Sequence, residues 1–132
     1  MADGARLAAR ARVTLVVAAL AMACGVALGA FGAHGLRARV PADMLAVWQT
    51  AVQYHAWHGL ALFGAGLLML RAPAARGLVA AAALFALGIL LFSGSLYALV
   101  LTGVRGWGAI TPIGGVAFIA GWLVLAWTAW RG

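Results

Sequence analysis

The chain has 132 residues, of which 67% are hydrophobic and 8% are charged. A soluble domain carries about 25% charged residues, so this composition excludes a water-soluble globular protein and predicts a single integral membrane domain over residues 1–132. The formal net charge is +7, and all nine basic residues are arginines that lie at or between the apolar runs. We therefore expect the arginines to meet lipid headgroups of the bilayer, and we do not expect nucleic acid as a partner.

The first predicted helix covers about residues 5–33. Three arginines precede an apolar run, residues 13–31, which has about the twenty residues needed to cross a bilayer. An arginine-rich start before an apolar run is also typical of a signal peptide. The run continues past Cys24 with no polar tether, however, which favours a retained helix. The glycine-rich segment 29–36, which contains His34, ends this helix.

The second predicted helix covers about residues 41–70. Pro41 suits a first helical turn, and Asp43 complements the positive end of the helix dipole. This helix has roughly thirty residues, or about 45 Å at 1.5 Å per residue, which is longer than the apolar core of a bilayer. We therefore expect its first two turns to lie in the membrane interface, with Trp48 as an interfacial anchor.

The third and fourth predicted helices cover about residues 74–101 and 112–130. A basic turn that contains Pro73 precedes the third helix, and Thr111-Pro112 precedes the fourth as N-cap and first helical residue. Short connections force neighbouring helices to run antiparallel. The predicted fold class is therefore all-α, an up-down four-helix transmembrane bundle.

The arginines also predict how this bundle is oriented. Six of the nine lie in the amino-terminal segment, the second connection and the carboxyl-terminal end, and three lie in the first and third connections. Short loops with more Lys and Arg stay in the cytoplasm. We therefore expect both termini to be cytoplasmic.

Most polar side chains of the predicted spans fall on the side of the membrane away from the termini. The candidate polar cluster consists of His34, Gln53, Tyr54, His55, His58, Ser93, Ser95 and Tyr97. Polar side chains at membrane depth usually face the bundle interior or water, and ionisable ones are functional candidates. We therefore expect a dry cytoplasmic half and a polar cavity that opens toward the outer face.

Three explanations of the polar cluster remain open. The first is hydrogen bonding between helices that only holds the bundle together. The second is a metal or haem site that uses His55 and His58, which are neighbours at i, i+3, with His34 as a third candidate ligand. The third is a binding site for a small molecule, a lipid headgroup or a quinone. The sequence assigns no cofactor to the cluster.

Enzyme signatures are not evident in the chain. Its two carboxylates, Asp3 and Asp43, lie outside the predicted spans, and no nucleophile is accompanied by a base and an orienting acid. We therefore expect a non-enzymatic membrane protein that acts as an accessory or assembly factor, with a membrane protein or a second copy as candidate partner. A small carrier or channel ranks lower, because four helices enclose little pore.

Several short blocks of the sequence recur together in a known family. The blocks are residues 29–36 (GAFGAHGL), 48–58 (WQTAVQYHAWH), 92–97 (FSGSLY) and 110–115 (ITPIGG), with Gly121-Trp122. In this order they resemble the family called domain of unknown function 423, which includes small YgdD-like proteins of bacteria and transmembrane protein 256 of eukaryotes. The resemblance covers about residues 13–125. It implies a multi-pass protein of the bacterial inner membrane and no particular activity.

Overall fold

The computed structural model describes residues 2–132, which fold into helices with no strand in that range. Helix α1 spans Ala2–Phe31 and continues into a π-helical turn, η1, over Gly32–Leu36. Helix α2 spans Ala42–Arg71. The prediction of an all-helical chain is confirmed.

The third helical segment is a single helix with a wide turn in its middle. Helix α3 spans Arg76–Gly88, the π-helical turn η2 spans Ile89–Ser93, and α4 spans Gly94–Thr102. Gly103 ends this segment in the left-handed conformation, with φ of 70°, and its N–H donates to the carbonyl of Leu99.

The fourth helical segment follows a short turn. A 3₁₀ turn, η3, covers Arg105–Ala109, and α5 spans Thr111–Arg131 with a proline in its first turn. The predicted range 112–130 falls inside α5.

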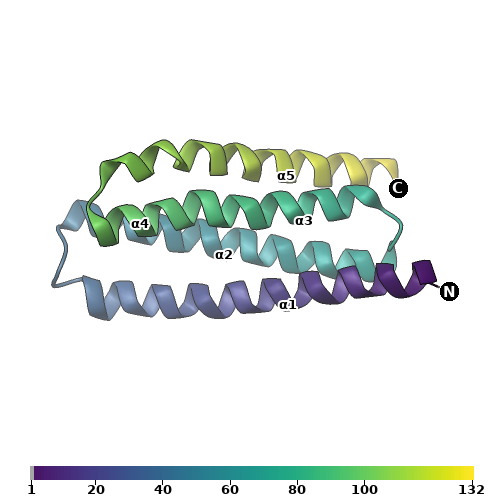
Figure 1. Cartoon of the computed structure of the whole chain (residues 1–132), viewed down its shortest axis with the longest axis horizontal. Helices are drawn as coiled ribbons and strands as arrows, with labels where there is room; N and C mark the ends of the chain where they lie inside the picture. The colour runs from purple at the N-terminus through teal and green to yellow at the C-terminus, as the bar shows by residue number, and fades with distance from the viewer. Residues whose placement is uncertain (1) are drawn as a thin grey trace.

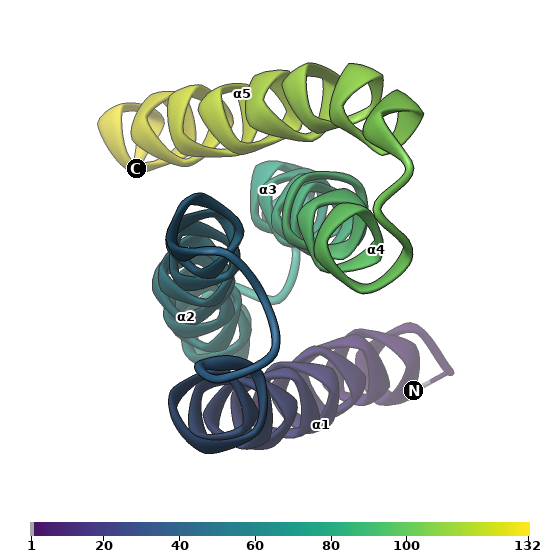
Figure 2. The same cartoon turned by 90° about the vertical axis from the view of Figure 1, so that its left-hand side faces the viewer.

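The helical segments lie side by side along the long axis, and consecutive segments run in opposite directions (Figure 1). Both termini lie at one end of the molecule, which we call the terminal end, and η1 and η3 lie at the other, which we call the loop end. Viewed from the loop end, α2 and the α3–α4 segment separate α1 from α5 (Figure 2). Helix α1 packs along α2, α2 packs on α3, and α3 packs on α5.

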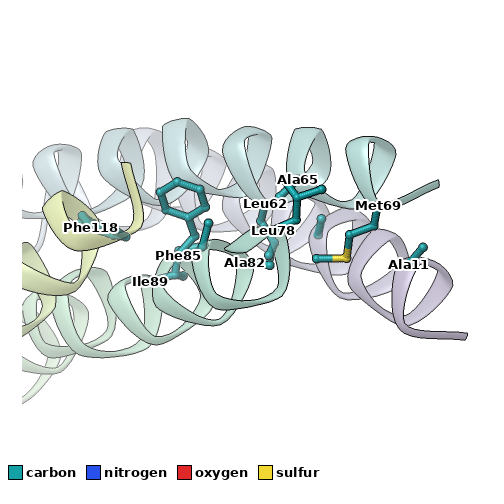
Figure 3. Packing of buried hydrophobic residues seen from close by; sticks show 11 residues of the cluster. Ala11, Leu62, Ala65, Met69, Leu78, Ala82, Phe85, Ile89 and Phe118 are labelled. Carbon is teal, nitrogen blue, oxygen red and sulfur yellow. The ribbon is translucent and has the colours of Figure 1, made fainter. Parts of the chain in front are cut away.

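The largest apolar core lies toward the terminal end. Its buried residues are Ala11, Ala18, Leu62, Ala65, Met69, Leu78, Ala81, Ala82, Phe85, Ile89 and Phe118. Figure 3 shows these side chains from several helices meeting with only carbon and sulfur at the contact. A smaller cluster around Leu36, Trp48 and Val100 lies toward the loop end. Four buried polar side chains, those of His55, His58, Ser93 and Ser95, lie in the same helices as these clusters.

Three of the helical segments are long and apolar enough to cross a membrane: residues 4–36, 76–102 and 105–131. Helix α2 is equally long but is not among them. The reason is its polar stretch between Gln49 and His58, which lowers its mean hydropathy. Any crossing by α2 therefore depends on neighbouring helices that satisfy these polar groups.

The expectation that Trp48 anchors α2 in the membrane interface is wrong. This side chain is 1% exposed. Its indole N–H donates to the carbonyl of Leu28 on α1 at 2.9 Å. The centroid of its ring lies 4.7 Å from the centroid of the Tyr97 ring on α4. Gly32 makes room for it, because a methyl group at Gly32 would lie 2.7 Å from the indole nitrogen. Trp48 is thus a packing residue between α1, α2 and α4.

Candidate functional site

His55 links three helices through its two ring nitrogens. Its Nε2 lies 2.8 Å from the carbonyl oxygen of Ala21 on α1, and its Nδ1 lies 3.1 Å from the hydroxyl of Tyr97 on α4. A carbonyl can only accept, so Nε2 carries the proton, and in the neutral ring Nδ1 accepts from Tyr97. Gly25 lies beside the ring, and a methyl group there would be 3.5 Å from the imidazole, which is an ordinary van der Waals contact.

His58 uses its nitrogens in the opposite way. Its Nδ1 donates to the carbonyl of Tyr54, one turn earlier in α2, at 2.7 Å. Its Nε2 accepts from the indole N–H of Trp122 on α5 at 3.1 Å. An indole N–H can only donate, so this geometry requires a neutral imidazole protonated at Nδ1. The ring also stacks on Phe118, with centroids 3.5 Å apart.

Two serines of the third helical segment complete the contacts. Ser93, in the π-helical turn, donates to the carbonyl of Ala51 on α2 at 2.8 Å and is fully buried. Ser95 donates to the carbonyl of Phe92 at 2.9 Å and lies 2.6 Å from the hydroxyl of Thr111 at the start of α5. The two serines, two residues apart, thus bind different neighbouring helices.

The close approach of α5 to the π-helical turn depends on Gly114. A methyl group at this position would lie 2.7 Å from the Cα atom of Phe92 and would overlap its backbone nitrogen. Main-chain atoms of a packed helix cannot move aside as the end of a flexible side chain can. Glycine is therefore required for the backbone contact that brings Thr111 to Ser95.

The structure brings together part of the predicted polar cluster. His55 and Tyr97 are hydrogen-bonded, and His58 bonds to the backbone of Tyr54. The Tyr54 ring stacks on Phe92, with centroids 4.6 Å apart. His34 and Gln53 are exposed at the surface. His34 lies in η1 at the loop end, away from the two buried imidazoles of α2.

Gln53 lines a surface hollow of about 390 Å³ instead. The other residues around this hollow are Gly29, Gly32, Ala33, Trp48, Gln49 and Val52, from α1, η1 and α2. Two amide side chains are its principal polar groups, and neither buried imidazole lines it. The sequence predicts a polar cavity that contains the histidines. The hollow near the loop end is lined by Gln49 and Gln53 and not by His55 or His58.

The histidine nitrogens are poorly arranged for holding a metal. Within the part of the chain that the structure describes, no three His, Cys, Asp or Glu side chains come close enough to share an ion. His55 and His58 turn toward different helices, and each has one ring nitrogen protonated and the other accepting a hydrogen bond. A metal ion or haem iron would have to displace Tyr97 or Trp122 from its ring.

Sequence reasoning did not assign roles to several partners in these contacts. The carbonyls of Ala21, Leu28 and Ala51 accept side-chain hydrogen bonds, and the sequence gives no sign of this. Trp122 was named from the sequence only as part of the blocks that resemble the family. The signal available for it was chemical, because an indole N–H that is not in water needs an acceptor.

Comparisons with known proteins agree with the resemblance seen in the sequence. The model of the family described as protein of unknown function (DUF423) matches residues 28–115. No solved structure matches the chain.

Three relatives illustrate the similarity. The UPF0382 membrane protein YwdK of Bacillus subtilis (strain 168) is 45% identical over 114 residues, which are 86% of this chain and 93% of that protein. A UPF0382 membrane protein of Staphylococcus epidermidis (strain ATCC 12228) is 46% identical over 114 residues, or 86% of this chain and 92% of that protein. The UPF0382 inner membrane protein YgdD of Escherichia coli (strain K12) is 42% identical over 114 residues, or 86% of each chain. The blocks that carry the resemblance contain His55, Tyr97, His58 and Trp122, whose hydrogen bonds link the helices, and the chain belongs to the DUF423 family of membrane proteins.

Proposed function

We propose that the chain is a non-enzymatic accessory or assembly factor of the bacterial inner membrane. In this proposal its helical segments form an up-down four-helix transmembrane bundle with both termini in the cytoplasm. The polar cluster holds the bundle together, and the protein acts on a partner through its outer helix faces.

One observation carries the structural role of the cluster: both nitrogens of both buried histidines are already hydrogen-bonded within the chain. A general base needs an unprotonated nitrogen that faces a substrate, and a metal ligand needs a free lone pair. Each accepting nitrogen here faces a donor on a neighbouring helix. Interhelical hydrogen bonding therefore accounts for the histidines with no further ligand.

The same contacts support a membrane crossing by α2. A backbone or side-chain polar group in lipid must be satisfied inside the protein. His55, His58 and Trp48 find partners on α1, α4 and α5, and the carbonyl of Ala51 accepts from Ser93. Helix α2 can therefore lie among the other three helices although its own hydropathy is low.

The outer helix faces remain for contact with a partner. Leu20 on α1 is 65% exposed and Leu123 on α5 is 66% exposed, and both lie on apolar faces. Helix α1 packs chiefly along α2, so most of its surface is open to lipid or to another membrane protein. This arrangement favours action through a surface over action in an internal pocket.

The structural role of the histidines is tested by His55→Ala, with Gln53→Ala as the matched control in the same helix. We expect His55→Ala to lower the free energy of unfolding by about 0.6–2 kcal/mol for each of its two hydrogen bonds, and the exposed control to have little effect. Visible absorbance and elemental analysis of the detergent-purified protein complete the test. A Soret band, or one metal ion per chain that is lost in His55→Ala, would contradict this structural role and would indicate metal or haem binding.

The accessory role is tested by photo-crosslinking in native membranes. A photoreactive amino acid is placed at Leu20 or Leu123, with buried Ala18 as the control position. The proposal predicts a discrete protein adduct from at least one exposed face and none from the buried position. Adducts with lipid alone from both faces would contradict the accessory role.

A further inference from the structure

Three arginines gather around two adjoining hollows at the terminal end of the molecule. The first hollow, of about 320 Å³, is lined by Arg6, Arg10 and Arg76 with Pro73 at the turn between α2 and α3. The second, of about 580 Å³, has Arg6 and Arg10 at one side. Its remaining walls are Ala9, Val13, Thr14, Met69 and Val79. Because Arg6, Arg10 and Val79 line both, the two hollows form one continuous surface depression with a basic part and an apolar part.

The charge of this depression is almost uncompensated. Arg6 and Arg10 lie one turn apart on the same side of α1, and Arg76 approaches from the start of α3. The chain has two carboxylate side chains, of which Asp43 lies in the first turn of α2 at the loop end, and the Asp3 side chain lies outside the described ones. Three guanidinium groups therefore face at most one side-chain carboxylate. Such a cluster attracts an anion.

We propose that this depression binds one anionic phospholipid, with its phosphate among Arg6, Arg10 and Arg76 and an acyl chain along Val13 and Met69. Guanidinium groups suit phosphate because their N–H groups can donate to two oxygens at once. From Arg6 to Thr14 the helix rises about 12 Å, which is enough to lead from the headgroup region into the acyl region. The inference rests on the membrane placement given in the proposed function. A lipid fits the combination of basic and apolar walls, whereas a free anion would use only the basic part.

The test is a native mass spectrometry titration of the detergent-purified full chain with dioleoyl phosphatidylglycerol, and in parallel with the neutral dioleoyl phosphatidylcholine. The test variant is the triple substitution Arg6→Gln, Arg10→Gln and Arg76→Gln. The matched control carries Gln in place of three arginines at the loop end, Arg37, Arg39 and Arg105, and so loses the same charge. We expect each arginine removed from the depression to weaken phosphatidylglycerol binding about fivefold, and the control to leave it within about twofold.

A second pair of variants tests the apolar part and needs no change of charge. Val13→Trp adds bulk at a residue that is 61% exposed and lines the second hollow, whereas Val16→Trp adds the same bulk at a residue that is 58% exposed and lines neither hollow. We expect only Val13→Trp to lower phosphatidylglycerol binding.

Equal binding of the two lipids, or equal losses in the two triple variants, would overturn the proposal. Full displacement of the lipid by inorganic phosphate at millimolar concentration would also overturn it, because the site would then recognise a free anion. None of these results depends on His55 or on crosslinking from Leu20, so failure here is distinguishable from failure of the proposed function.

Discussion

Replacing Gly114 with alanine should separate α5 from the π-helical turn of the third helical segment. The added methyl group would lie 2.7 Å from the Cα atom of Phe92, whereas carbon atoms in contact lie about 3.5–4 Å apart, so α5 must move by roughly 1 Å. Overpacking of this kind typically costs about 1–3 kcal/mol. The same shift would stretch the 2.6 Å contact between Ser95 and Thr111, one turn before Gly114, beyond hydrogen-bond length.

Losing that hydrogen bond adds about 0.6 kcal/mol, which brings the expected loss of unfolding free energy to about 1.5–3.5 kcal/mol. Gly115→Ala is the matched control. A methyl group there would have its nearest neighbour at 3.8 Å, an ordinary contact with the Phe92 ring. Both substitutions replace glycine by alanine in the same helix, so the gain in helix propensity cancels in the comparison.

Equilibrium unfolding in mixed micelles, followed by circular dichroism as the denaturing detergent is increased, would measure both variants. We expect Gly114→Ala to unfold well before the wild type and Gly115→Ala to unfold with it or after it. Equal stability of the two variants would refute the close backbone contact and the argument built on it.

Two further predictions concern the imidazoles. Tyr97→Phe removes the hydroxyl that donates to His55 and should lower the unfolding free energy by about 0.6 kcal/mol, and by about 2 kcal/mol at most. Tyr54→Phe should lower the unfolding free energy less, because Tyr54 contacts His58 through its backbone carbonyl and not through its hydroxyl. The same unfolding titration measures both, and an equal effect would contradict the assigned bond. Nitrogen-15 NMR of the imidazoles should find His55 protonated at Nε2 and His58 at Nδ1, and the same tautomer in both rings would contradict the network.

Fold class was accessible from the sequence because hydropathy and helix-ending residues are read along the chain. Long apolar runs in a chain with 8% charged residues leave helices as the means of satisfying the backbone in lipid. Wide π-helical turns were not accessible in the same way. The turn at Ile89–Ser93 inserts an extra residue and rotates the following side chains by about 100°, and it lies where Gly114 meets Phe92 on another helix. Its position therefore depends on packing between segments far apart in sequence.

The candidate site was partly predictable for a related reason. Spacing at i, i+3 placed His55 and His58 on neighbouring positions of one helix face. Those positions differ by about 60° around the axis, which is enough for His55 to reach α1 and α4 while His58 reaches α5. His34 and Gln53 share the polar character of the histidines but face outward. Which direction is interior depends on the order in which helices pack, and that order is not a local property of the sequence.

The backbone acceptors are the part of the hydrogen-bond network that the sequence predicts least well. Trp48, His55 and Ser93 each donate to a main-chain carbonyl on another helix, and every residue has such a carbonyl. What differs between residues is whether the side chain allows a donor to come within about 3 Å of the oxygen. Ala51 is fully buried and its carbonyl accepts from Ser93, so an alanine that reads as a featureless hydrophobic position leaves the serine room to reach the α2 backbone. Enlarging Ala51 to leucine should therefore disrupt the Ser93 contact as effectively as removing the serine hydroxyl itself.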